Sequence, residues 1–134
     1  MKRVVNLTMA IILAASSAVQ AKPSLWSYPR VDQGLFDMGV AYGIKENCDS
    51  LDERTLYGLS FALSLRSFAR NQGYTNDEVM DFWKSKKERK ALRVRVTKYL
   101  NDQGLDPDTP NALCAFGKQQ MADETQVGKF LRNK

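Results

Sequence analysis

Three copies of one short helix-start pattern constrain the fold of this chain more than any other feature. The pattern places a serine or threonine three residues before a glutamate, and it occurs at residues 50–53, 75–78 and 85–88. In such a capping box, the hydroxyl and the carboxylate satisfy backbone amides that the start of a helix leaves without partners. Apolar residues at helical spacing follow each box. The sequence therefore predicts an all-α fold.

Apolar residues at helical spacing, and glycines that end helices, predict where the helices of this fold lie. The expected helices cover 31–46, 50–72, a short segment from 75, 85–102, and a last segment that begins at Pro110. The second helix is apolar around much of its circumference, which is typical of a central, buried helix. Gly39 and Gly43 in the first helix would let another backbone approach closely, and the apolar tail 127–131 is expected to dock on the body. We expect a small bundle of about five helices and no strand.

The start of the chain has the features of a cleaved export signal. A basic start precedes a mostly apolar run of 12 residues, Val4–Ala15, and small or aliphatic residues stand at −3 and −1 of a cut after Ala21. The run is shorter than the roughly 20 residues needed to span a bilayer, which favours cleavage over a retained anchor. The expected organisation is a signal peptide at 1–21 and a single helical domain at 22–134, located in the periplasm.

Export also bears on the two cysteines. Cys48 and Cys114 lie 66 residues apart, whereas a redox-active pair would need the C-x-x-C spacing. In an oxidising compartment, two cysteines in a small domain are most simply one structural disulfide. Closing a loop of this length stabilises a fold by about 4 kcal/mol in the chain-entropy model. The bridge would join the end of the first helix to the start of the last.

Several classes of chemistry are excluded by composition. The chain has no histidine, so Ser-His-Asp and Cys-His mechanisms and His-ligated metal sites are ruled out. Two cysteines are too few for a four-cysteine zinc or iron–sulfur site. A calcium loop begun at Asp106 fails because Asn111 and Gly117 stand where glycine and glutamate are needed. We predict no catalytic residue, no metal and no cofactor, and we expect the protein not to be an enzyme.

Positive charge is concentrated in the predicted fourth helix. The whole chain carries a net charge of +5, and residues 82–100 hold eight basic side chains against one acidic one. At 100° per residue, Lys86, Lys90 and Arg93 fall on one side, opposite the apolar row. This side is either only solvated or a docking face for an acidic partner protein or an anionic membrane surface. Nucleic acid is not expected as the partner of an exported protein.

Two acidic clusters leave a second class of function open. They comprise Asp49, Asp52 and Glu53 beside the first cysteine, and Asp77, Glu78 and Asp81 at the start of the short helix. Amide dipoles favour carboxylates at helix starts, and carboxylates can also act as general acids and bases. Aromatic side chains that could line a pocket between helices are Phe61, Phe68, Phe82 and Trp83. The alternative function is a small-ligand binder or a histidine-free hydrolase.

A series of short motifs extends over nearly all of 22–134. The motifs are Asn47-Cys48, Gly73-Tyr74-Thr75, Tyr99-Leu100, Cys114-Ala115-Phe116-Gly117 and Gly128-Lys129-Phe130-Leu131-Arg132. In this order they resemble a family of small exported two-cysteine helical proteins of unknown function from Rhodobacter-type alphaproteobacteria. The resemblance brings no catalytic residues. It implies an accessory place on the periplasmic side of the respiratory NADH dehydrogenase, complex I.

Taken together, export, the lack of histidine and the single charged face favour a non-enzymatic interaction or accessory protein in the periplasm. Its expected partner is a protein or an inner-membrane complex.

Overall fold

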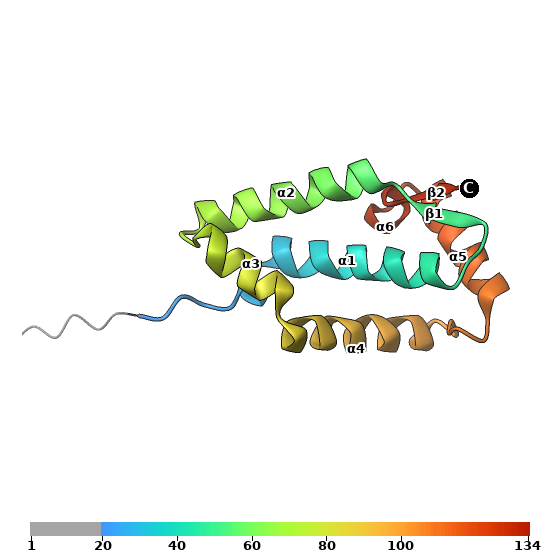
Figure 1. Ribbon diagram of the computed structural model, residues 1–134. Helices are drawn as coiled ribbons and strands as arrows, with labels where there is room; N and C mark the ends of the chain where they lie inside the picture. Colours follow the sequence, from blue (N-terminus) through green and yellow to red (C-terminus); the bar gives the residue numbers. More distant parts are fainter. Residues whose placement is uncertain (1–19) are drawn as a thin grey trace, which may run out of the picture.

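The computed structural model describes residues 20–134, which form a mostly helical chain with a small antiparallel sheet (Figure 1). The predicted signal peptide at 1–21 lies outside the described residues except for its last two positions. The elements in chain order are the 3-10 turn η1 (Leu25–Ser27), α1 (Pro29–Glu46), β1 (Leu51–Glu53), α2 (Thr55–Asn71), α3 (Asn76–Lys84), α4 (Lys86–Asp102), α5 (Pro110–Ala122), α6 (Gln126–Lys129) and β2 (Leu131–Asn133).

Helix α1 is the central element of the fold. Figure 1 shows it between α2 and α4, with α3 joining these two helices at one end. A Cβ atom at Gly34 would lie 3.1 Å from the Leu65 side chain of α2, and one at Gly39 would lie 2.9 Å from Val96 of α4. The glycines of α1 therefore allow both neighbours to pack closely against it. The prediction of a central, buried helix at 50–72 is wrong, because α1 occupies that place and α2 packs with one side only.

The capping box predicted at residue 50 is also wrong. Residues 51–53 form strand β1, which pairs antiparallel with β2 so that Leu51 lies opposite Asn133. The Leu51 side chain is fully buried, and extended backbone carries it into the core. Helix α2 begins only at Thr55 and has no side-chain cap. The all-α prediction is corrected accordingly: the fold is mostly helical and contains a two-stranded sheet.

The other two boxes are confirmed as helix starts. At α3, the Thr75 hydroxyl accepts a hydrogen bond from the Glu78 amide at 3.2 Å, and the Glu78 carboxylate accepts one from the Thr75 amide at 2.6 Å. At α4, the Ser85 hydroxyl accepts from the Glu88 amide at 3.3 Å. The Glu88 carboxylate accepts instead from the indole N–H of Trp26. Glu88 therefore links α4 to the η1 turn.

The predicted disulfide is present and closes one end of the fold. Cys48 follows α1 directly and is bonded to Cys114 of α5, with 5.2 Å between the two Cα atoms. Around it, Gly117 packs so tightly that a Cβ there would lie 2.5 Å from a methyl group of Leu51. The tail docks here as predicted, since Phe130 is buried in the same cluster. We call this region, made of the disulfide, α5, α6 and the two strands, the disulfide end.

A second apolar cluster lies at the opposite end of α1. Its buried members are Leu25, Val31, Ala69, Tyr74 and Val79. The turn η1 and helix α3 supply part of this cluster, so packing ties the start of α1 to the end of α2.

Candidate functional site

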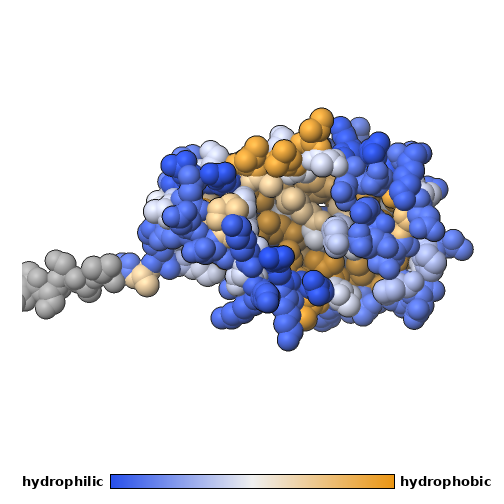
Figure 2. All heavy atoms as spheres, in the orientation of Figure 1, coloured by the Kyte–Doolittle hydropathy of each residue, from blue (hydrophilic) through white to orange (hydrophobic). Residues whose placement is uncertain are grey.

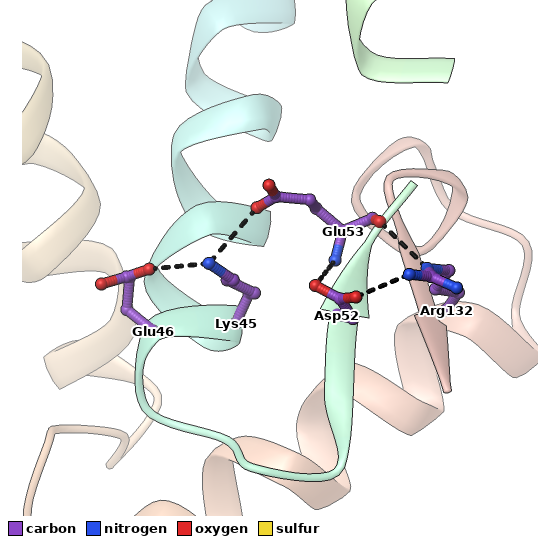
Figure 3. A network of polar contacts seen from close by, with 5 residues as sticks. All are labelled: Lys45, Glu46, Asp52, Glu53 and Arg132. Carbon is purple, nitrogen blue, oxygen red and sulfur yellow. Dashed lines mark hydrogen bonds and ion pairs between the residues drawn. The ribbon is translucent and has the colours of Figure 1, made fainter. Parts of the chain in front are cut away.

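Two members of the first acidic cluster, Asp52 and Glu53, are engaged in ion pairs beside the sheet (Figure 3), and the third, Asp49, is exposed. Asp52 pairs with Arg132 at 2.7 Å, and Glu53 pairs with Lys45 at 3.5 Å. The backbone amide of Glu53, followed by the charge of Arg132, lowers the pKa of Asp52 below its ordinary value of 3.8. Lys45 also pairs with Glu46 at 3.1 Å. These carboxylates fasten strand β1 to β2 and to α1.

The second acidic cluster has a similar structural role at the start of α3. Glu78 belongs to the capping box and pairs with Lys22 at 2.7 Å, and the bond from Lys22 is the main cause of its lowered pKa. Asp77 and Asp81 are exposed on the same helix. Figure 1 places α3 and β1 at opposite ends of the molecule. The fold therefore does not bring the two acidic clusters together.

The aromatic side chains proposed as pocket lining are partly buried and pack against the two apolar clusters. Phe61 packs edge-on to Phe130, with ring centroids 5.0 Å apart. Phe82 packs edge-on to Trp26 at the same distance. Phe68 and Trp83 contact the second apolar cluster. These contacts identify the four aromatic side chains as packing residues.

The feature that the sequence did not predict is an apolar surface across α2, α1 and α4. Leu56, Leu59 and Leu63 of α2 are 83%, 57% and 50% exposed, and Tyr42 of α1 is 60% exposed. Figure 2 shows this surface as an apolar hollow with apolar side chains at its upper edge and hydrophilic ones to the left, to the right and below. Exposed apolar patches with a polar rim mark interaction sites on soluble domains. We call this surface the apolar face.

The local sequence explains why α2 contributes leucines to the surface. Leu56, Leu59 and Leu63 follow one another at helical spacing and form one row. The buried residues of the same helix, Leu65 and Ala69, form another row that faces α1 and the second cluster. Helix α2 is thus apolar on two sides, and within residues 20–134 only one of them is covered.

Two grooves run along the apolar face. The larger, between α1 and α4, has a volume of about 540 Å³, and we call it the α1–α4 groove. The smaller, between α1 and α2, has a volume of about 330 Å³. Met38 and Tyr42 line both grooves and form the ridge between them. The two grooves are therefore parts of one continuous surface.

Basic side chains stand at one end of the α1–α4 groove. Lys86, Lys90 and Arg93, the predicted docking face, are all exposed, but of these only Arg93 lines the groove. Arg89, which the prediction omitted, lines it too. Arg89 lies one helical turn before Arg93 and three residues before Leu92. This spacing was the signal in the sequence that could have placed Arg89 at the groove. Within residues 20–134, none of these four basic residues forms an ion pair.

The described residues contain no arrangement suited to holding a metal. Nowhere in 20–134 do three cysteine or carboxylate side chains gather as metal ligands would. In the same part of the chain, no helix combines the length and the apolar character that crossing a membrane requires.

The fold and its surface define a small, disulfide-linked, mostly helical domain with an uncovered apolar face. Comparison of the sequence with known families gives the particular group: the chain belongs to a family of unknown function, DUF5333, which it matches over residues 23–132. Neither a curated protein nor a solved structure matches the chain. The resemblance inferred from short motifs is thus confirmed at the level of a family of unknown function.

Proposed function

We propose that this protein is a non-enzymatic interaction module that acts as an accessory protein of an inner-membrane complex on its periplasmic side. The observation that carries the proposal is the uncovered apolar face, above all the exposed leucine row of α2. Fully burying a leucine side chain is worth about 1.5 to 3 kcal/mol. A partner that covered this row and the adjoining grooves would therefore gain a substantial part of its binding energy from α2.

The proposed location is supported by the chain outside the described residues and by the disulfide. The first 21 residues have the composition of a cleaved signal peptide. A disulfide between Cys48 and Cys114 persists in an oxidising compartment such as the periplasm. The resemblance to proteins of Rhodobacter-type bacteria makes the respiratory NADH dehydrogenase the first complex to test.

Affinity capture from membranes tests this function. The tagged protein, exported and then isolated with membranes dissolved in a mild detergent, should recover a membrane complex, with subunits of the NADH dehydrogenase among its proteins. Replacing Leu56, Leu59 and Leu63 together with glutamine should abolish the recovery. Val94→Gln is the matched control, because Val94 is 60% exposed but lies on α4, outside the leucine row of α2. Recovery of only the soluble monomer at low salt would refute the proposal.

A second candidate function, a small-ligand binder, is favoured by the volume of the α1–α4 groove. About 540 Å³ lies within the usual range of ligand sites, about 300 to 1,000 Å³. The acidic clusters line neither end of this groove, so they offer no reacting groups to a ligand bound in it. Calorimetric titration with a long-chain fatty acid tests this candidate. Saturable binding that Tyr42→Asp abolishes would support it, because Tyr42 is exposed and lines the groove, and absence of heat would end it.

A further inference from the structure

We infer that the α1–α4 groove binds an amphipathic α-helix of the partner, with acidic side chains facing Arg89 and Arg93. This inference rests on the proposed function and specifies the chemistry of the partner at the same surface. It is carried by the shape of the groove and by the placement of charge along it.

The groove has the length and form of a site for a helix. Its lining extends along α1 from Leu35 to Glu46, which at 1.5 Å per residue is about 16 Å, or three helical turns. Gly39 and Gly43 let α4 pack close to α1, so Val96 and Leu100 form an apolar floor of the groove. Helix-in-groove recognition uses apolar anchors at i, i+3 or i+4, and i+7, which span about two turns. Three such anchors fit along this length.

Charge is distributed unevenly along the groove. Arg89 and Arg93 lie beside the Leu35 end, because α1 and α4 run in the same direction, with Val96 against Gly39. The middle is apolar, with Met38, Leu92 and Val96, and Glu46 lies at the far end. Neither arginine has an ion-pair partner within residues 20–134. An acidic side chain near one end of the bound helix would therefore meet two unneutralised guanidinium groups.

A second copy of this chain fits the groove less well. The most exposed apolar helix that a copy could offer is α2, and its sequence from Thr55 to Asn71 contains two arginines and no acidic residue. Docking it against Arg89 and Arg93 would bring like charges together. A flat anionic membrane matches the charge but not the shape, since Figure 2 shows the apolar region as a hollow below its rim.

Fluorescence anisotropy with two defined peptides tests the inference. The probes are labelled peptides of about 14 residues, crosslinked to remain helical because short helices are marginal in water. Both carry leucines at i, i+3 and i+7, and the remaining positions hold alanine with either glutamate or lysine. The purified exported protein should bind the glutamate peptide at least about tenfold more tightly than the lysine peptide, and added salt should reduce the difference.

Two double variants of equal charge identify the site. Arg89→Gln/Arg93→Gln should weaken binding of the glutamate peptide about tenfold, whereas Lys86→Gln/Lys90→Gln, on the same helix but outside the groove, should change it by less than about threefold. Equal losses in the two variants would show diffuse attraction and overturn the inference. All four positions are exposed, so unchanged melting temperatures are expected for both variants.

The remaining outcomes identify other occupants. Failure of both peptides to bind, with binding to phosphatidylglycerol vesicles, would assign the groove to lipid and overturn the inference. Self-association in analytical ultracentrifugation that Tyr42→Asp abolishes would assign the groove to a second copy and overturn the inference. Capture of a membrane complex that depends on the α2 leucines, without binding of the glutamate peptide, would overturn the helix as occupant and leave the proposed function intact.

Discussion

The disulfide end and the apolar face are both built on helix α1, yet their packing is opposite. At the disulfide end, Ile44 and Leu51 are fully buried, and α5, α6 and the two strands surround the end of the helix. On the apolar face, Met38 and Tyr42 form a ridge between two grooves and Leu56 is almost fully exposed. The difference indicates a division of tasks. One region supplies stability, and the other presents surface that a partner can bury.

Removal of the disulfide should have the largest effect on stability. Cys48→Ser/Cys114→Ser should lower the free energy of unfolding by about 4 kcal/mol, because the bridge closes a loop of 66 residues. Urea denaturation measures the loss, and mass spectrometry of the protein, produced with its first 21 residues, should find the two cysteines joined to each other. Two free thiols would contradict a structural disulfide.

Gly128→Ala should be the next most damaging change. A Cβ atom at this position would overlap the backbone carbonyl of Gln120, and backbone yields less easily than a side chain. We expect a loss of at least about 3 kcal/mol in the free energy of unfolding. Gly58→Ala is the matched control on the apolar face. No atom lies within 4 Å of a Cβ there, so the better helix propensity of alanine should stabilise α2 by up to about 1 kcal/mol.

Two leucines on the same helix sharpen the comparison further. Leu65→Ala should cost about 3 kcal/mol, because Leu65 is buried against α1 and its removal leaves a cavity. Leu63→Ala should change the free energy of unfolding by less than about 0.5 kcal/mol, because its side chain is half exposed. Urea melts of both variants measure the difference. A similar loss for Leu63 would show that the apolar face is part of the stabilising core.

The ion pair on the sheet should make a small, pH-dependent contribution. The pKa of Asp52 is lowered in the folded state, so its carboxylate stabilises the fold above the ordinary pKa of 3.8, and this stabilisation is lost as the pH falls through the lowered value. Asp52→Asn should therefore be less stable than wild type at neutral pH and lose less stability below pH 3.8. Thermal melts of both proteins across the acid range check this. Parallel curves would contradict the role given to Asp52.

The smallest effect on stability is expected from substitution of the basic residues of α4. Replacing Lys86, Lys90 and Arg93 together with glutamine should leave the melting temperature nearly unchanged, because all three are exposed and glutamine is a good helix former. Co-sedimentation with inner-membrane vesicles should weaken, and the salt dependence seen for wild type should decrease. Equal, salt-independent sedimentation of both proteins would identify this side of α4 as merely solvated.

Local signals in the sequence were sufficient for most helices. The Thr75 and Ser85 boxes are made by residues three positions apart, so a short stretch of sequence contains both partners of each hydrogen bond. The disulfide was predictable because the sequence predicts export, and two cysteines leave one pairing. The box at Ser50 has the same spacing but fails, because Leu51 is drawn into the core by a strand partner about 80 residues away.

The candidate site was less predictable than the fold. Helical periodicity identified the apolar character of α2 but gave no information on which of its sides a neighbour covers. The charge pattern of α4 indicated Arg93 as part of a docking face and missed Arg89, because the prediction placed docking directly opposite the apolar row. In the structure, the groove lies beside that row, so the arginines next to Leu92 are the ones that reach it.

The pairing of β1 with β2 has a consequence for the order of events during biosynthesis. Arg132 bonds to Asp52 across 80 positions of sequence, so β1 acquires its partner only when nearly the whole chain described here has been made. Cys114 likewise follows Cys48 by 66 residues. Until then the end of α1 next to Cys48 lacks the elements that cover it, and the polypeptide lacks its disulfide and its sheet. The disulfide end is therefore the last part of this chain to be completed, after residues 25–83, which contain the second apolar cluster, are already present.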